Sequence, residues 1–259
     1  NSNPFTLTGL SASTNFDAYV RANCGGAVSY WSLPTRFATL CGPTTVPYME
    51  NFDAYAMNNS STIAPDNYPN DPMPTCWDFL NRDDRNQVFL TTRSGCAVHG
   101  NCLLFKLLQS TPTFAILPEF VNDIRNLAIS FYLRKDGVST MGRGIFIIGY
   151  LTDPNDTSTF VPTYTIGNND FATGMHHIQE ITFDSAPIGS RIAFKCQSTS
   201  SLIYYTLDNV VVDLLPNCRK PHDVVASNAT TNSIDVAWTE MGGATAWNIE
   251  YGPIGFTQG

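Results

Sequence analysis

The stretch that decides the fold spans residues 125–134 and reads Arg-Asn-Leu-Ala-Ile-Ser-Phe-Tyr-Leu-Arg. Large apolar side chains stand at every second position of this stretch, and smaller or polar ones stand between them. Such alternation predicts a β-strand, because successive side chains of a strand point to opposite faces of its sheet. We therefore expect one face of this strand to belong to the hydrophobic core; its residues are Leu127, Ile129, Phe131 and Leu133.

Similar short runs recur along the chain, whereas patterns with the period of a helix are scarce. They are rich in Val, Ile, Tyr, Phe and Thr, and clusters of Gly, Pro, Asn and Asp separate them. This spacing predicts an all-β fold of the sandwich type. The clearest expected strands are residues 16–21, 103–108, 127–133, 144–151, 191–196, 203–212 and 233–238.

The amino-acid composition limits the classes of function that this chain can have. The chain has 259 residues, a net charge of -8 and only 14% charged residues. An acidic chain is a poor nucleic-acid binder, because Lys and Arg are needed to displace phosphate counterions. Divalent cations are compatible with this charge. No apolar run is long enough to span a bilayer. The first eight residues lack the pattern of a signal peptide, so we expect any export signal to lie outside this sequence.

Two linker-like stretches divide the chain. Residues 41–47 are rich in Pro and Gly, and residues 216–221 begin and end with Pro. We accordingly expect three parts, namely residues 1–45, 46–216 and 217–259. The terminal parts are too short to form independent sandwiches without special support.

The terminal parts resemble two halves of bacterial fibronectin type III domains. Residues 218–259 look like a first half, through the alternation at 233–238 and the stretch Trp-Asn-Ile-Glu-Tyr-Gly at 247–252. Residues 4–41 look like a second half, most clearly at 19–26, Tyr-Val-Arg-Ala-Asn-Cys-Gly-Gly. Since the halves stand in reverse order, we infer about one period of a tandem array. The alternative is a chain that includes parts of two unlike domains.

The central part resembles the MAM-like jelly-roll domains called choice-of-anchor J or cleaved adhesin, of the gingipain adhesin type. The matching stretches include residues 48–53, 74–77, 114–120, 129–134, 147–154 and 207–211. This resemblance implies a jelly-roll β-sandwich in a secreted or surface-displayed bacterial protein. Together, the resemblances cover almost the whole chain.

The resemblance to cleaved adhesins also implies a structural calcium ion. Asp53, near the start of the expected jelly roll, and Asp208, near its end, match the acidic positions of the family. First and last strands of a sandwich can lie close together, and Ca²⁺ binds carboxylate and carbonyl oxygens. Asp83 is a third candidate ligand. The alternatives are that Asp53 caps a turn, that Asp208 accepts backbone hydrogen bonds, and that Asp83 belongs to a solvated ion-pair loop.

Seven cysteines without paired C-x-x-C spacing indicate disulfides in an oxidising compartment rather than a zinc site. Buried free thiols in a cytosolic protein are the alternative. Cys96 and Cys102 flank a short turn, so we predict a local bridge. By analogy with a complete fibronectin sandwich, Cys24 should meet Cys218 when complementary halves join. The partner half would come from a successive repeat, a neighbouring chain or the same chain. The sequence favours no partner for Cys41, Cys76 or Cys196.

Catalysis finds little support in the sequence. Nucleophile-elbow, zinc-protease and P-loop motifs are absent, and none of the five glutamates has an acidic neighbour two positions along. Adjacent His176 and His177 would face opposite sides of a strand.

Glycan binding needs exposed aromatic platforms instead of catalytic residues. The candidates are Trp31, Trp77, Tyr68, Tyr164 and Tyr204, although a core position is favoured for Trp77.

The resulting hypothesis is a non-enzymatic module of a secreted, repetitive adhesin or extracellular fibre, with structural Ca²⁺. Its expected partners are neighbouring copies or repeats of itself, joined through the fibronectin halves; a host protein or glycan is a further candidate, and nucleic acid and a membrane span are not expected. The alternative is a carbohydrate-binding module of a secreted enzyme, and a glycosidase is third. Ser185, in an Asp-Ser-Ala stretch, resembles a bacterial O-glycosylation acceptor.

Overall fold

The computed structural model describes residues 3–55, 73–83, 85–92, 95, 98–137, 144–167, 174–198, 202–216, 218–219, 221–240 and 242–257. Within these ranges the chain is all-β, with two short 3-10 turns, Ile124–Asn126 and Thr157–Thr159. No helix in the described ranges is long and apolar enough to cross a bilayer. The all-β prediction is therefore confirmed.

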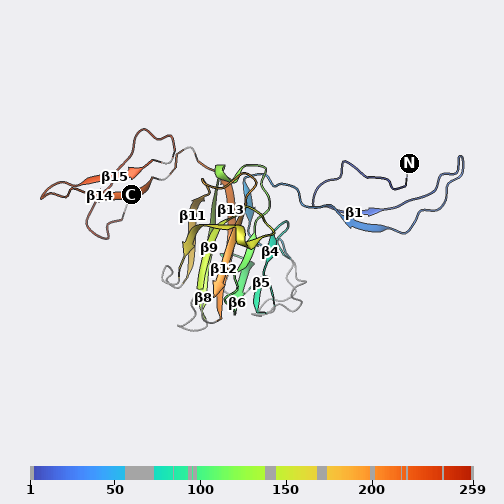
Figure 1. The fold of residues 1–259 in the computed structure, drawn as a ribbon, viewed down its shortest axis with the longest axis horizontal. Coiled ribbons are helices and arrows are strands. Elements are labelled where there is room, and N and C mark those ends of the chain that lie inside the picture. Colours follow the sequence, from blue (N-terminus) through green and yellow to red (C-terminus); the bar gives the residue numbers. More distant parts are fainter. Residues whose placement is uncertain are drawn as a thin grey trace. The chain divides into compact units, whose positions relative to one another are not determined.

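Two antiparallel sheets form the central part (Figure 1). The six-stranded sheet has the order β11-β8-β13-β6-β5, and β3 pairs with β13 beside this path. Its strands are β3 (Tyr48–Glu50), β5 (Asn86–Thr91), β6 (Cys102–Leu107), β8 (Leu127–Gly137), β11 (Met175–Thr182) and β13 (Ile203–Leu214).

The five-stranded sheet has the order β10-β9-β12-β7-β4. Its strands are β4 (Asp78–Leu80), β7 (Thr113–Ile116), β9 (Gly144–Leu151), β10 (Phe160–Ile166) and β12 (Arg191–Ser198). Several strands adjacent in these sheets are distant in sequence, such as β13 and β3. This arrangement brings the beginning and the end of the central part together.

The core lies between the two sheets and follows the alternation that the sequence predicts. Leu127, Ile129, Phe131 and Leu133 are all buried, while the residues between them face away from the core. Phe194 from the opposite sheet is the aromatic centre of this core. Its ring lies 5.1 Å from that of Phe131, 5.4 Å from that of Phe146 and 6.2 Å from that of Trp77, measured between centroids.

Each terminal piece contains a two-stranded sheet of its own, as far as the described residues show. In the N-terminal piece, β1 (Asn15–Ala18) pairs with β2 (Thr35–Ala38). In the C-terminal piece, β14 (His222–Ser227) pairs with β15 (Asp235–Thr239). The chain divides into the compact units Asn1–Asp213 and Leu214–Gly259. The assignment of the two pieces to fibronectin halves stays a prediction.

Candidate functional site

Asp53 lies just after β3 and binds the loop that leads into β6. Its Oδ1 accepts a hydrogen bond of 2.7 Å from the backbone N–H of Asn101, and its Oδ2 accepts one of 3.2 Å from Asn51 Nδ2. The Asn101 side chain donates in return to the backbone carbonyls of Phe52 and Tyr55. Residues 48 positions apart in sequence are thus fastened to each other.

Asp208, on β13, holds the same loop from the other side. Its side chain is fully buried, and its Oδ2 accepts a hydrogen bond of 2.7 Å from the backbone N–H of Val98. Its Oδ1 accepts one of 2.7 Å from the backbone N–H of Asn209. The carboxylates of Asp53 and Asp208 therefore clasp residues 98–101 between them.

The two carboxylates are close enough to influence each other electrostatically. Burial raises the pKa of Asp208 above its usual value, and the Asp53 charge adds to that rise, while the N–H groups of Val98, Asn209 and His99 oppose it. Two like charges in a partly dehydrated site repel each other, and a bound cation relieves that repulsion.

Gly100 is a site residue that the sequence analysis missed. It has a φ of +65°, and a Cβ atom added there would lie 1.9 Å from Asp53 Oδ1. Only glycine adopts this conformation readily and leaves room for the carboxylate. The sole sequence signal was a glycine beside Asn101, which is also typical of an ordinary turn.

Glu50 stands beside the clasp but is already engaged. Its carboxylate accepts hydrogen bonds from the backbone N–H of Phe52, at 2.7 Å, and from the hydroxyl of Tyr55, at 3.0 Å. Phe52 has a φ of +61° and is fully buried, so Glu50 stabilises an unfavourable backbone conformation. This is a structural role.

Asp83 lies in the turn between β4 and β5, where its Oδ1 accepts from the backbone N–H groups of Arg85 and Asn86, at 2.8 and 2.6 Å. Across the described residues, no three His, Cys, Asp or Glu side chains gather in a metal-binding arrangement. The structure thus joins Asp53 with Asp208 and does not bring Asp83 to them.

The residues of the clasp fit a hard cation such as Ca²⁺. Each carboxylate oxygen of Asp53 and Asp208 can accept a second interaction besides its hydrogen bond. Ca²⁺ takes six to eight oxygen ligands, which include carboxylates and water. No soft ligand stands in the pair, which disfavours zinc.

A disulfide joins Cys41 to Cys76, although the sequence favours no partner for either residue. Their Cα atoms lie 5.7 Å apart, and the bridge closes a separation of 35 residues. It fastens the end of the N-terminal piece next to Trp77, whose indole is buried in the core. Thr44 supports the same junction through backbone hydrogen bonds with Glu119 and Val121.

The other predicted cysteine pairs stay predictions. Cys96 lies outside the described residues, while Cys102 is buried at the start of β6. Cys24 and Cys218 are both exposed and form no disulfide in this single chain. Cys196 is buried in the core, and burial raises its thiol pKa.

The aromatic candidates for glycan binding separate into buried and exposed groups. Tyr204 is buried, so its prediction as an exposed platform is wrong; it packs with Phe89 and Leu104 on the six-stranded sheet. Trp77 is a core residue, as favoured, and its Nε1 donates to the Tyr48 hydroxyl at 2.7 Å. Trp31 and Tyr164 are exposed, and Tyr68 lies outside the described residues.

His177 forms a further exposed aromatic feature. It lies opposite Tyr132 across β11 and β8, with ring centroids 4.3 Å apart and ring planes 3° from parallel. Ser185, the candidate modification site, lies in an exposed turn between β11 and β12. It is accessible there, and its glycosylation stays a prediction.

Comparison with known proteins finds similar folds at low identity. No family model and no curated protein match the chain. The K1 cleaved adhesin domain of Lys-gingipain from Porphyromonas gingivalis W83 is 14% identical with a TM-score of 0.46, and the match covers 65% of this chain and 98% of that one. The CBM22-1 xylan-binding domain from Paenibacillus barcinonensis is 16% identical with a TM-score of 0.40, and the match covers 64% and 92%. These values do not assign a function.

Proposed function

We propose that the chain is a non-enzymatic module of a secreted, repetitive bacterial cell-surface adhesin or extracellular fibre, which mediates adhesion or assembly. One observation carries the proposal. The neighbouring carboxylates of Asp53 and Asp208 clasp a loop through its backbone N–H groups, and Asp208 is fully buried. A catalytic carboxylate must instead reach the substrate.

Ca²⁺ is the cofactor of this proposal. Asp53 and Asp208 would hold it through their carboxylates. Its role would be structural, since it would neutralise two repelling carboxylates and tie the first and last strands of the sandwich to one loop. A module that transmits force between a surface and its target gains resistance to local unfolding from such a clasp.

The proposed location is outside the cell. The Cys41–Cys76 disulfide supports an oxidising compartment, because cytosolic thiols are kept reduced. The proposed partners are neighbouring copies or repeats of the chain, joined through its terminal pieces, and host proteins or glycans at the target.

The test combines binding and turnover. Purified chain should release no product from a panel of polysaccharides, and it should retain cells or host-protein-coated beads in a surface adhesion assay. Turnover that disappears in Asp53→Asn would overturn the non-enzymatic assignment. A chain that neither adheres nor assembles would overturn the adhesin role.

A carbohydrate-binding module is the second candidate, because the exposed His177 ring stacks on the half-buried Tyr132 ring on a sheet, and aromatic rings stack on sugars. A glycan array should decide. If this pair binds sugar, His177→Ala should abolish binding, whereas Tyr164→Ala removes an exposed aromatic from the other sheet and should leave binding unchanged.

A further inference from the structure

The N-terminal hairpin has one apolar and one polar face. Its first strand and the extension beyond it alternate Phe16, Ala18, Val20 and Ala22 with polar or amphipathic residues. Phe37 lies opposite Phe16 on the same face, with ring centroids 5.6 Å apart. Yet Val20 is 72% exposed. This alternation is that of a half-buried sheet, but the single chain buries the face incompletely.

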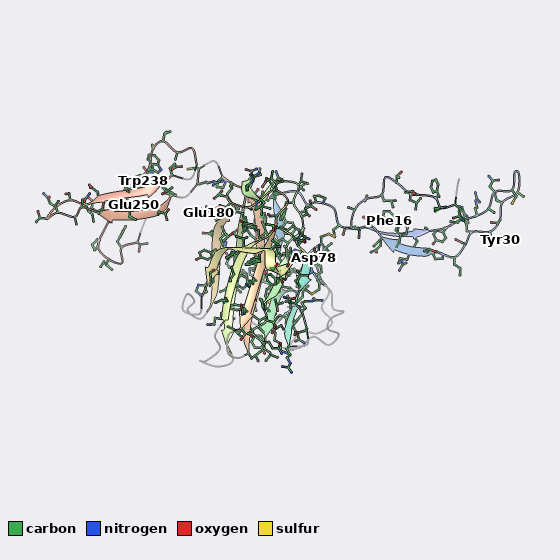
Figure 2. The ribbon with its side chains drawn as sticks, in the orientation of Figure 1. Phe16, Tyr30, Asp78, Glu180, Trp238 and Glu250 are labelled. Carbon is green, nitrogen blue, oxygen red and sulfur yellow. A yellow bond between two sulfur atoms is a disulfide. The ribbon has the colours of Figure 1, made fainter. Side chains whose placement is uncertain are left out.

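The opposite face of this hairpin mixes charged and aromatic side chains. Asp17 pairs there with Arg36 at 3.0 Å, and the Arg21 guanidinium lies 4.5 Å from the centre of the Trp31 ring. Figure 2 shows Phe16 and Tyr30 on this piece, with Tyr30 near its tip. Tyr19 and Trp31 are 51% and 57% exposed, so this face too carries exposed aromatic rings, but charged side chains accompany them.

The C-terminal piece has the same two-sided character. Ala226 pairs with Val236 on one face of β14 and β15, and Trp238 follows on that face. Trp247 packs on Trp238 with ring centroids 5.5 Å apart, and Ile249 continues the alternation. Val236, Trp247 and Ile249 are nevertheless 40%, 41% and 59% exposed. Residues 247–251 alternate like a strand, although the described residues place them in none.

Each of these sheets is too small to be stable alone. A two-stranded sheet is marginal in water, and a sheet with one apolar face is stabilised by packing that face on another sheet. The two pieces also carry opposite net charges. Residues 3–41 hold one acidic and two basic residues, and residues 218–257 hold four acidic and two basic residues, giving +1 and -2.

We propose that the apolar face of the N-terminal hairpin packs against the apolar face of the C-terminal sheet of a second copy. This inference rests on the proposed assembly role and names the surfaces that perform it. Two different surfaces meet in this contact. One copy of the pair therefore keeps its C-terminal face free, and the other copy keeps its N-terminal face free. Such head-to-tail association continues into an open chain of copies rather than stopping at a dimer.

The first experiment measures assembly of the full chain by light scattering and sedimentation over a wide concentration range. Mass should rise with concentration beyond that of a dimer. Val236→Asp places a charge on the apolar face and should weaken association by about tenfold or more. Val225→Asp is the matched control, because Val225 stands on the other face of β14 and is 56% exposed. A chain that stays monomeric up to its solubility limit, or equal weakening by both variants, would overturn the proposal.

The second experiment identifies which surfaces meet. Cys24 and Cys218 place one exposed thiol on each terminal piece, so a short bismaleimide reports their proximity. The proposal requires intermolecular Cys24-to-Cys218 links, which Cys218→Ser should remove. Links of Cys24 to Cys24 only, or a Cys24-to-Cys218 link within a monomer, would overturn it. Adhesion by a monomeric chain would refute this contact and leave the adhesin role intact. Polysaccharide turnover would refute the proposed non-enzymatic role and leave the contact between copies intact.

Discussion

Removal of the Asp208 carboxylate tests the calcium site most directly. If Ca²⁺ binds only the folded chain, an ion concentration one hundred times the Kd stabilises it by about 2.7 kcal/mol. For a domain of this size, that corresponds to a rise in Tm of about 5 to 10 °C. We expect this rise when Ca²⁺ replaces chelator in the wild-type chain, and we expect Asp208→Ala to abolish it.

The same variant should also lower the Tm measured in chelator. Asp208→Ala leaves the N–H groups of Val98 and Asn209 without their acceptor. A fully buried donor left unsatisfied costs about 1 to 3 kcal/mol, and these half-buried N–H groups should cost less. The diagnostic result is therefore the loss of the Ca²⁺-dependent rise in Tm, and not a lower Tm in chelator.

Differential scanning calorimetry in Ca²⁺ and in chelator measures both the rise in Tm that Ca²⁺ causes and the Tm without Ca²⁺. Should Asp208→Ala fail to fold, Asp53→Asn tests the same pair with a smaller change. Asp83→Ala is the control, because Asp83 caps a separate turn and its loss should preserve the calcium response. Identical wild-type Tm values in both buffers, with no metal found by elemental analysis, would refute the site.

Four further predictions concern three single residues and one cysteine pair. Gly100→Ala should weaken Ca²⁺ binding by at least tenfold in calorimetric titration, since its Cβ would displace Asp53 Oδ1; unchanged affinity would contradict the clasp geometry. Cys41→Ser should destabilise the chain by about 4 kcal/mol in denaturant melts, the loop entropy for 35 residues, and an unchanged midpoint would show the bridge to be inert. Phe194→Ala should cost about 3 to 5 kcal/mol in the same assay, and a cost under 1 kcal/mol would argue against a central core position. Peptide mapping without reductant should find Cys96 bridged to Cys102; two free thiols would reject that pair.

The strands were the part most accessible to sequence reasoning. The expected strand at 144–151 coincides with β9, and those at 127–133 and 191–196 lie within β8 and β12. Alternation involves only consecutive residues, so it can be recognised without knowing which strands pair with the segment. Element ends were less accurate: β8 extends to Gly137, four residues beyond the expected end, although its pairing with β11 stops at Arg134.

Tyr204 shows where the same reasoning failed. Alternation correctly separates it from Tyr205 on the inner face, but the opposite face was taken to be exposed. Tyr204 instead packs with Phe89 and Leu104 from β5 and β6. A strand's own sequence gives the two faces, and neighbouring strands determine how deeply the second face is buried.

By itself, the sequence determined the all-β class and the inward set of Leu127 to Leu133, while the family resemblance pointed to the acidic positions Asp53 and Asp208. Only the tertiary structure decided that these acids clasp one loop, that Gly100 makes room for them, and that Cys41 pairs with Cys76. The physical reason is sequence distance. The Asp208 contact with Val98 spans 110 positions and that of Asp53 with Asn101 spans 48, so both depend on the order of strands in the sheet. Local patterns specify which face of a strand is apolar, whereas contacts across such distances exist only once the sheets have assembled.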